Sequence, residues 1–257
     1  MSALSNSRSG ASLGGTLSAY LGLIWFVGDR HRELRRPLLR EQLYRQIFGA
    51  GVAALPVIGV LALLTGAAVT TQLSALLGAD SDLTQRMLFL GLFYELAPLL
   101  SALVVVARSS AGIASELAVM RLHDEFTALR RLGVPAADYL LLPRIVGLAI
   151  ALPAVTACFQ AISIGSGWLA TALFEGRPLA EAAGRFLDLA DPWLALLSLV
   201  KSALMGAAVG IVACHHGSSG TRSSHGISGA AMQSVGTGLV AVFVIDVAFA
   251  LLLYVLR

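Results

Sequence analysis

Five long apolar runs, separated by charged segments, dominate the pattern of hydrophobic and polar positions along the chain. They cover residues 47–69, 87–107, 145–174, 193–213 and 226–256. Each run is at least as long as the roughly 20 residues that a helix needs to cross the hydrocarbon core of a bilayer. None shows the alternation of apolar and polar residues that is typical of a membrane-spanning strand. The pattern therefore predicts an all-α integral membrane protein with five spanning helices.

Composition agrees with this class and excludes others. Of the 257 residues, 57% are hydrophobic and 13% are charged, whereas about 25% are charged in ordinary soluble domains. The net charge of +3 is not carried by lysine-rich blocks, which argues against a nucleic-acid partner. Cys158 and Cys214 both lie in apolar runs, so no disulfide framework is predicted. We expect one domain over 1–257, with an N-terminal region at 1–45 and the five-span bundle at 46–257.

The N-terminal region predicts helices that lie on the membrane instead of crossing it. The apolar stretch 17–27 is too short to span and carries aromatic residues suited to the interface. No small-residue cleavage site follows it, so we expect it to be retained. Segment 30–45 holds six arginines among leucines, which indicates a basic amphipathic helix along the cytoplasmic surface. A solvated connector is the alternative interpretation.

The basic residues also predict an orientation. If the N-terminus is cytoplasmic, the connecting segments on that side carry thirteen Lys and Arg residues, and those on the opposite side carry four. Cytoplasmic segments of membrane proteins carry such an excess. The N-terminus is therefore predicted to be cytoplasmic, and five spans place the C-terminus across the membrane.

Segment 108–144 is predicted to be a cytoplasmic loop that contains one short helix. Leu122, Phe126, Leu129 and Gly133 recur at helical spacing and share one face. Gly133, with a proline two residues later, favours a helix end, so we expect the helix over 122–132. An exposed apolar face suits a groove in a partner protein. The alternative is that Phe126 and Leu129 fold back onto the bundle.

Three ionisable residues, Glu95, Lys201 and Asp246, lie inside the predicted spans. A charge at the bilayer centre costs about 2.5–3.5 kcal/mol on insertion scales, so such groups pair, face a polar cavity or contact a charged substrate. A structural ion pair or a hydrated position near the headgroups is equally open. The sequence does not say whether Glu95 and Lys201 meet.

Other polar features favour structural roles. Cys214, His215 and His216 are adjacent, unlike the spaced ligands of most zinc sites, so no metal site is predicted. The Gly- and Ser-rich segment 215–228 is instead predicted to be a flexible loop. Gly206 and Gly210 permit close contact between two helices. The sequence contains no G-x-x-x-x-G-K-[ST] motif and no nucleophile elbow, so we predict neither a nucleotide site nor catalysis in this chain.

A series of short motifs begins at the second span. It reads E-L-A-P at 95–98, A-R-S-S-A at 107–111, E-L-A-V-M at 116–120, D-E at 124–125, A-L at 128–129, G-V-P at 133–135 and L-P-R at 142–144. In order and spacing it resembles the MlaE (YrbE) permease family of ABC transporters. Lys201, Cys214 and Asp246 look like the family's later pattern, so the resemblance extends from about residue 35 to the C-terminus.

This resemblance implies a homodimer with an interfacial N-terminal helix and five spans per subunit. It implies two copies of a cytoplasmic ABC ATPase, which would bind ATP and Mg, and a periplasmic MCE-domain protein. The permease itself would be no enzyme and would hold no cofactor. Its substrate would be phospholipids or related lipids moved between the bacterial inner membrane and the outer envelope. The 122–132 helix would then be the coupling helix that docks on the ATPase.

The resemblance also assigns candidate residues. Those expected to couple to the ATPase are Glu116, Leu122, Asp124, Glu125, Phe126, Leu129 and Arg130, and those expected along the substrate path are Tyr94, Glu95, Lys201, Gln233 and Asp246. Tyr94 stands where the family often has arginine, and segment 226–233, which ends at Gln233, lacks both arginines of the family pattern. If those arginines hold anionic headgroups in relatives, this chain handles a different lipid or contacts the headgroup through Lys201 alone.

Two other functions fit parts of the pattern. An ion-coupled secondary transporter would use Glu95 and Asp246, would purify without an ATPase and would respond to an ion gradient. A membrane scaffold that recruits cytoplasmic partners would lose no function when Glu95, Lys201 or Asp246 is replaced.

Overall fold

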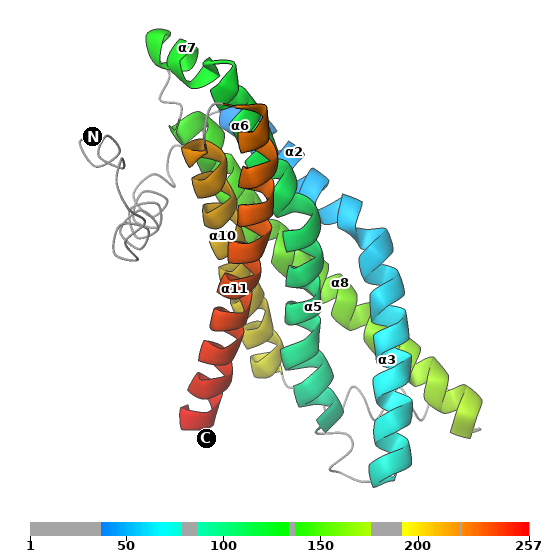
Figure 1. Cartoon of the computed structure of the whole chain (residues 1–257). Coiled ribbons are helices and arrows are strands. Elements are labelled where there is room, and N and C mark those ends of the chain that lie inside the picture. Colours follow the sequence, from blue (N-terminus) through cyan, green and yellow to red (C-terminus); the bar gives the residue numbers. More distant parts are fainter. Residues whose placement is uncertain (1–36, 79–86, 134–136, 176–191, 221–222, 257) are drawn as a thin grey trace.

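The computed structural model describes residues 37–78, 87–133, 137–175, 192–220 and 223–256, and its regular elements are helices (Figure 1). In chain order they are α2 (Pro37–Gly51), η2 (Val52–Ala54), α3 (Leu55–Leu77), η3 (Phe89–Leu96), α5 (Ala97–Val105), η4 (Val106–Ser110), α6 (Ala111–Leu122), α7 (Glu125–Arg131), η5 (Ala137–Leu141), α8 (Leu142–Glu175), α10 (Pro192–Ser219) and α11 (Ser224–Leu256). The short α7 lies at the end of the bundle opposite the C-terminus (Figure 1).

The prediction of an all-α membrane protein with five spans is confirmed. Five helical stretches are long and apolar enough to cross a bilayer: Leu39–Leu77, Leu90–Leu122, Tyr139–Leu173, Trp193–Ser219 and His225–Val255. Each contains or closely overlaps one of the predicted apolar runs. The outer faces of α3 and α11 expose large apolar side chains, including Leu63, Leu64, Phe243, Val244 and Leu251. Exposed apolar surface on this scale suits lipid and not water.

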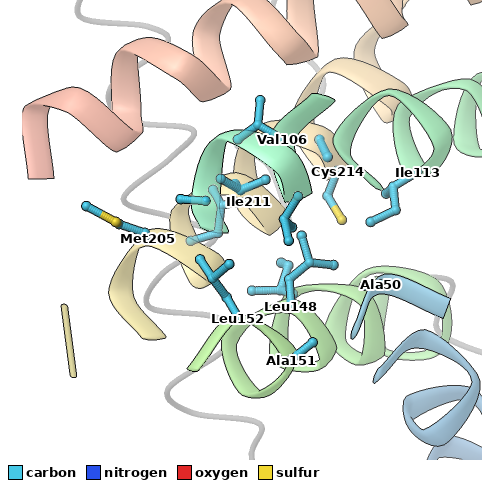
Figure 2. Packing of buried hydrophobic residues seen from close by; sticks show 14 of the residues in the cluster. Ala50, Val106, Ile113, Leu148, Ala151, Leu152, Met205, Ile211 and Cys214 are labelled. Carbon is cyan, nitrogen blue, oxygen red and sulfur yellow. The ribbon is translucent and has the colours of Figure 1, made fainter. Parts of the chain in front are cut away.

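Helices α8 and α10 form the centre of the bundle. Helix α8 packs against α2, α3 and α10, while α10 also packs against α6 and α11. Figure 2 shows the main core, which includes Leu148, Ala151 and Leu152 of α8 and Met205 and Ile211 of α10. A smaller apolar cluster joins α3 and α5 to α8.

Glycine permits the close approach of α8 and α10. A Cβ atom on Gly206 would lie 2.4 Å from the carbonyl oxygen of Leu148, and one on Gly210 would lie 2.9 Å from Cα of Ile145. Both distances are shorter than real Cβ contacts, so the two backbones meet only because these positions lack a side chain. The predicted close contact at the Gly206 and Gly210 pair is confirmed.

The predicted loop 108–144 is wrong in its first half, because the second span continues as helix through η4 and α6 to Leu122. A charged residue such as Arg108 therefore does not end the helix. The predicted 122–132 helix is also broken. Asp124 has a left-handed backbone with φ of 58°, which Asp tolerates better than most residues, and it separates Leu122 from α7. Gly133, with φ of 75°, ends this segment as predicted.

The predicted loop 215–228 is likewise mostly helical. Helix α10 continues through Ser219 and α11 begins at Ser224. The serines are accommodated within these helices, where Ser218 Oγ and Ser228 Oγ donate to carbonyls of the same helix. The connection is therefore short.

Part of the N-terminal prediction falls outside the described residues, namely the interfacial stretch 17–27 and positions 30–36 of the basic segment. The rest of that segment forms α2, which exposes Arg40 and Arg45 while Leu39 is buried. Helix α2 also exposes Tyr44 and Phe48, so an amphipathic helix along the cytoplasmic surface stays a prediction. Both cysteines, Cys158 and Cys214, are free thiols.

Candidate functional site

The three ionisable residues of the spans meet in one cluster. Lys201 Nζ on α10 lies 2.7 Å from Glu95 Oε2 on η3 and 2.7 Å from Asp246 Oδ1 on α11. The contact with Glu95 also has hydrogen-bond geometry, whereas the contact with Asp246 is close without hydrogen-bond alignment. Three separate spans thus contribute one charged group each.

An aromatic ring completes this charge cluster of Glu95, Lys201 and Asp246. Lys201 Nζ lies 4.8 Å from the centre of the Tyr94 ring, which is within the range of a cation–π contact. Tyr94 is buried. The ammonium group therefore has two carboxylates and an aromatic face around it, which offsets the large cost of removing a charge from water.

The charge cluster is exposed on its Glu95 side. It contains two carboxylates and one ammonium group, and Lys201 is 0% exposed while the Glu95 side chain is 36% exposed. A molecule that reaches the cluster from the surface therefore meets Glu95 before Lys201. In this conformation Lys201 is not available to an anionic headgroup; the assignment of these residues to a substrate path stays a prediction.

An irregular helix presents Tyr94 and Glu95. The segment η3 is π-helical, and Ala97 at its end donates its N–H to the carbonyl of Leu92, five residues earlier. A π-helical turn widens the helix and is often found at functional sites. Pro98 follows directly and contributes no N–H. Tyr94 and Glu95 thus stand on an unusual stretch of backbone that ends directly before Ala97 and Pro98.

Two uncharged residues near the cluster escaped the sequence analysis. Gln160 Nε2, on α8, donates to Ser198 Oγ of α10 at 2.9 Å and to the Phe93 carbonyl of η3 at 3.1 Å. Both polar side chains are buried. The available signal was a glutamine in the middle of an uncharged run, where a polar group needs a partner.

The structure does not bring Gln233 to the charge cluster. Gln233 is exposed and lies thirteen residues before Asp246 on α11, which is about 20 Å along the helix axis. Its backbone carbonyl accepts a hydrogen bond from Thr237. A substrate that contacts both Gln233 and Glu95 would have to extend over several helical turns.

The apolar residues of α7 pack onto the bundle. Phe126 and Leu129 are partly buried against the main core. Their contacts therefore match the alternative in which these two side chains fold back onto the bundle. Asp124, Glu125 and Arg130 are exposed. A partner that docks on α7 would therefore meet the polar side of this helix and the exposed Leu132 that follows it.

Two arginines tie the helix before α7 to its neighbours. Arg144 of α8 forms an ion pair with Glu116 of α6 at 3.1 Å, and Arg121 of α6 donates to the carbonyl of Ser218 on α10. The Arg144 side chain is 9% exposed, whereas that of Glu116 is 62% exposed, so the pair lies at the edge of the bundle. These contacts link α6 to both central helices.

The Cys-His-His sequence places its three side chains in different surroundings. Cys214 is buried in the main core, and its Sγ faces the carbonyl of Leu141 at 3.9 Å. His216 Nε2 shares a hydrogen bond with Thr237 of α11 at 2.9 Å. Across the portion of the chain that the structure describes, no three His, Cys, Asp or Glu side chains gather as metal ligands.

The fold and the cluster define a multi-span helical membrane protein with a buried charge site. The family model described as Permease MlaE matches residues 43–252. The chain therefore belongs to the MlaE permease family, an ABC transporter permease family.

Three relatives illustrate the similarity. The chain is 30% identical over 155 residues to Protein TRIGALACTOSYLDIACYLGLYCEROL 1, chloroplastic, of Arabidopsis thaliana. The aligned region covers 59% of this chain and 43% of that protein. It is 26% identical over 208 residues to a probable ABC transporter permease protein of Rickettsia felis, covering 79% of each. A probable ABC transporter permease protein of Synechocystis is 29% identical over 161 residues, covering 62% of this chain and 60% of that protein. The chain thus matches less than half of the Arabidopsis protein.

Proposed function

We propose that this chain is the permease subunit of an ATP-driven lipid transporter in a bacterial inner membrane. Two copies would form the transmembrane path, two cytoplasmic ABC ATPases would drive it, and an MCE-domain protein would bind on the periplasmic side. The N-terminus would be cytoplasmic and the C-terminus periplasmic. The observation that carries the proposal is the charge cluster, which lies among apolar helices in a chain of the MlaE permease family.

A polar site within apolar walls suits an amphipathic substrate. A lipid has one polar headgroup, which Glu95 could contact, and acyl chains, which apolar helix faces could accommodate. The name of the Arabidopsis relative contains that of a glycerolipid, which supports lipid as the substrate class. The energy would come from the ATPase, because the sequence contains no P-loop.

Purification of the intact assembly tests this function. The chain, tagged and extracted from the membranes of a cell that expresses its whole operon, is analysed by mass spectrometry for proteins and lipids. We expect an ABC ATPase, an MCE-domain protein and a bound phospholipid or related lipid. A chain that purifies alone and moves its substrate in response to an ion gradient would overturn the proposal in favour of a secondary transporter.

Replacing Leu132 by aspartate tests the docking role of the α7 region. Leu132 is 77% exposed next to α7, so Leu132→Asp removes an apolar contact with the ATPase without disturbing the core. We expect association with the ATPase to weaken at least about tenfold, as for a moderate interface hot spot. The dissociation constant is measured by biolayer interferometry in detergent. Phe126→Asp would be a poor probe, because Phe126 packs on the core.

Leu76→Asp serves as the matched control for this prediction. Leu76 is 82% exposed near the C-terminal end of α3. This end of α3 lies at the opposite end of the bundle from α7 (Figure 1). We expect this control to bind the ATPase like the unmodified chain. Docking through α7 would be refuted if Leu132→Asp bound the ATPase with unchanged affinity.

A further inference from the structure

Gln160 connects the two elements that carry the hydrogen-bonded ion pair of the cluster, Glu95 and Lys201. Its single side-chain nitrogen, Nε2, donates to the Phe93 carbonyl on η3 and to Ser198 Oγ on α10. Gln160 itself belongs to α8, which contributes no charge to the cluster. The side chain is 6% exposed, so these hydrogen bonds form away from water.

The two acceptors lie directly beside the charged residues. Phe93 precedes Glu95 by two residues, and Ser198 precedes Lys201 by three, about one helical turn. Ser198 Oγ also donates to the Ala195 carbonyl of its own helix, which fixes the position of its oxygen. A change in the Gln160 bridge therefore acts close to both halves of the Glu95–Lys201 pair.

The bridge also meets the irregular part of η3. Ala97, at the end of η3, donates its N–H to the Leu92 carbonyl five residues earlier, and the next carbonyl of this π-helical segment is that of Phe93. Gln160 donates to that carbonyl from the neighbouring helix. Side chains also donate to carbonyls of the other π-helical segments, Arg144 to Leu140 and Ser234 to Ser110. The hydrogen bonds from Gln160 and Ser234 run between packed helices, whereas Arg144 and Leu140 lie four residues apart in consecutive helical segments.

We propose that Gln160 is a positioning residue, whose amide sets the placement of Glu95 relative to Lys201. The Glu95–Lys201 contact is a charge-assisted hydrogen bond of 2.7 Å, and such a bond weakens steeply when its partners shift or tilt. Without the amide, η3 and α10 lose a shared anchor and the carboxylate and ammonium groups separate. The effect on transport rests on the proposed function, whereas the effect on the ion pair does not.

Lys201 gives a direct readout, because it is the only lysine in the sequence. Labelling the full-length chain with lysine that carries ¹⁵N at Nζ produces one side-chain resonance from this cluster. The test compares Gln160→Met, which keeps the length of the side chain but removes its donors, with the unmodified protein. We expect the Lys201 resonance to shift and, in the assembled transporter, ATP-driven lipid transfer to fall about tenfold.

Thr156→Val is the matched control. Thr156 is buried one turn before Gln160 on α8, and its hydroxyl is without a hydrogen-bond partner among the described residues. Valine has the same shape, so this variant removes a buried polar group without removing an interhelical hydrogen bond. We expect the Lys201 resonance and the transfer rate to stay as in the unmodified chain.

The outcomes separate the two claims. An unshifted Lys201 resonance in Gln160→Met overturns the positioning role, whatever happens to transport. A shifted Lys201 resonance with an unchanged rate of lipid transfer supports the positioning role. It contradicts the proposal that the charge cluster takes part in transport. If Gln160→Met does not fold, Ser198→Ala removes only the α10 side of the bridge. We expect this variant to shift the Lys201 resonance as well. An unshifted resonance in Ser198→Ala would overturn the positioning role.

Discussion

Lys201→Met is expected to destabilise the permease strongly and to abolish lipid transfer. The substitution keeps an unbranched side chain of similar length but removes the cation that lies 2.7 Å from both Glu95 and Asp246. Breaking a buried ion pair by removing one partner costs about 3–5 kcal/mol, because the remaining charge is left without compensation. Here two carboxylates lose their cation, so the melting temperature of the purified chain should fall by several degrees.

A neutral version of the whole cluster separates stability from function. In the triple variant Glu95→Gln, Lys201→Met and Asp246→Asn, no charge remains to be buried, and replacing a complete buried ion cluster is often neutral for stability. We expect the triple variant to recover most of the lost thermal stability but to transfer lipid at least about tenfold more slowly than the unmodified chain. Transfer at the unmodified rate would mean that the cluster is a structural ion pair.

Gly206→Val is expected to weaken the contact between α8 and α10 strongly. Its Cβ atom would lie 2.4 Å from a backbone oxygen, that of Leu148, which cannot rotate away as a side chain can. Helices α8 and α10 would have to separate, at a cost of about 3 kcal/mol. Because α10 carries Lys201, transfer should decline together with stability. Thermal unfolding of the purified chain, followed by circular dichroism, measures the change.

Gly165→Val is the control for this effect. Gly165 lies on α8 and a Cβ atom there would meet no heavy atom within 4 Å. The same change of residue type therefore alters helix propensity by a fraction of a kcal/mol without a steric clash. If Gly165→Val destabilised the chain as much as Gly206→Val, close helix packing would not explain the result.

The spans could be predicted from the sequence because the bilayer imposes one requirement on every crossing helix. That requirement is a mostly apolar helix of about 20 residues, and all five apolar runs form such helices. The ends of the helices could not be predicted in the same way. Arg121 and His216 are polar but remain helical, since hydropathy marks contact with lipid while backbone hydrogen bonds decide where a helix stops. The break at Asp124 depends on a left-handed backbone in a residue other than glycine.

The candidate site could be predicted only as separate residues. The cost of a charge in the membrane identifies Glu95, Lys201 and Asp246, but Glu95 and Lys201 are 106 residues apart in the chain and their contact depends on helix packing. Gln160 was missed because it is uncharged, and only its hydrogen bonds across two helices distinguish it. For α7, the periodicity of the sequence identified an apolar face. It could not show that this face packs on the main core of the same chain.

The rate of lipid transfer by the reconstituted assembly tests the central claim most directly. The complex is placed in donor vesicles with a fluorescent phospholipid, and transfer to acceptor vesicles is followed with ATP, with a non-hydrolysable ATP analogue and with an ion gradient alone. We predict transfer that requires ATP hydrolysis and is lost in Lys201→Met. Equal transfer with the analogue, or transfer driven by the ion gradient alone, would contradict an ATP-driven permease.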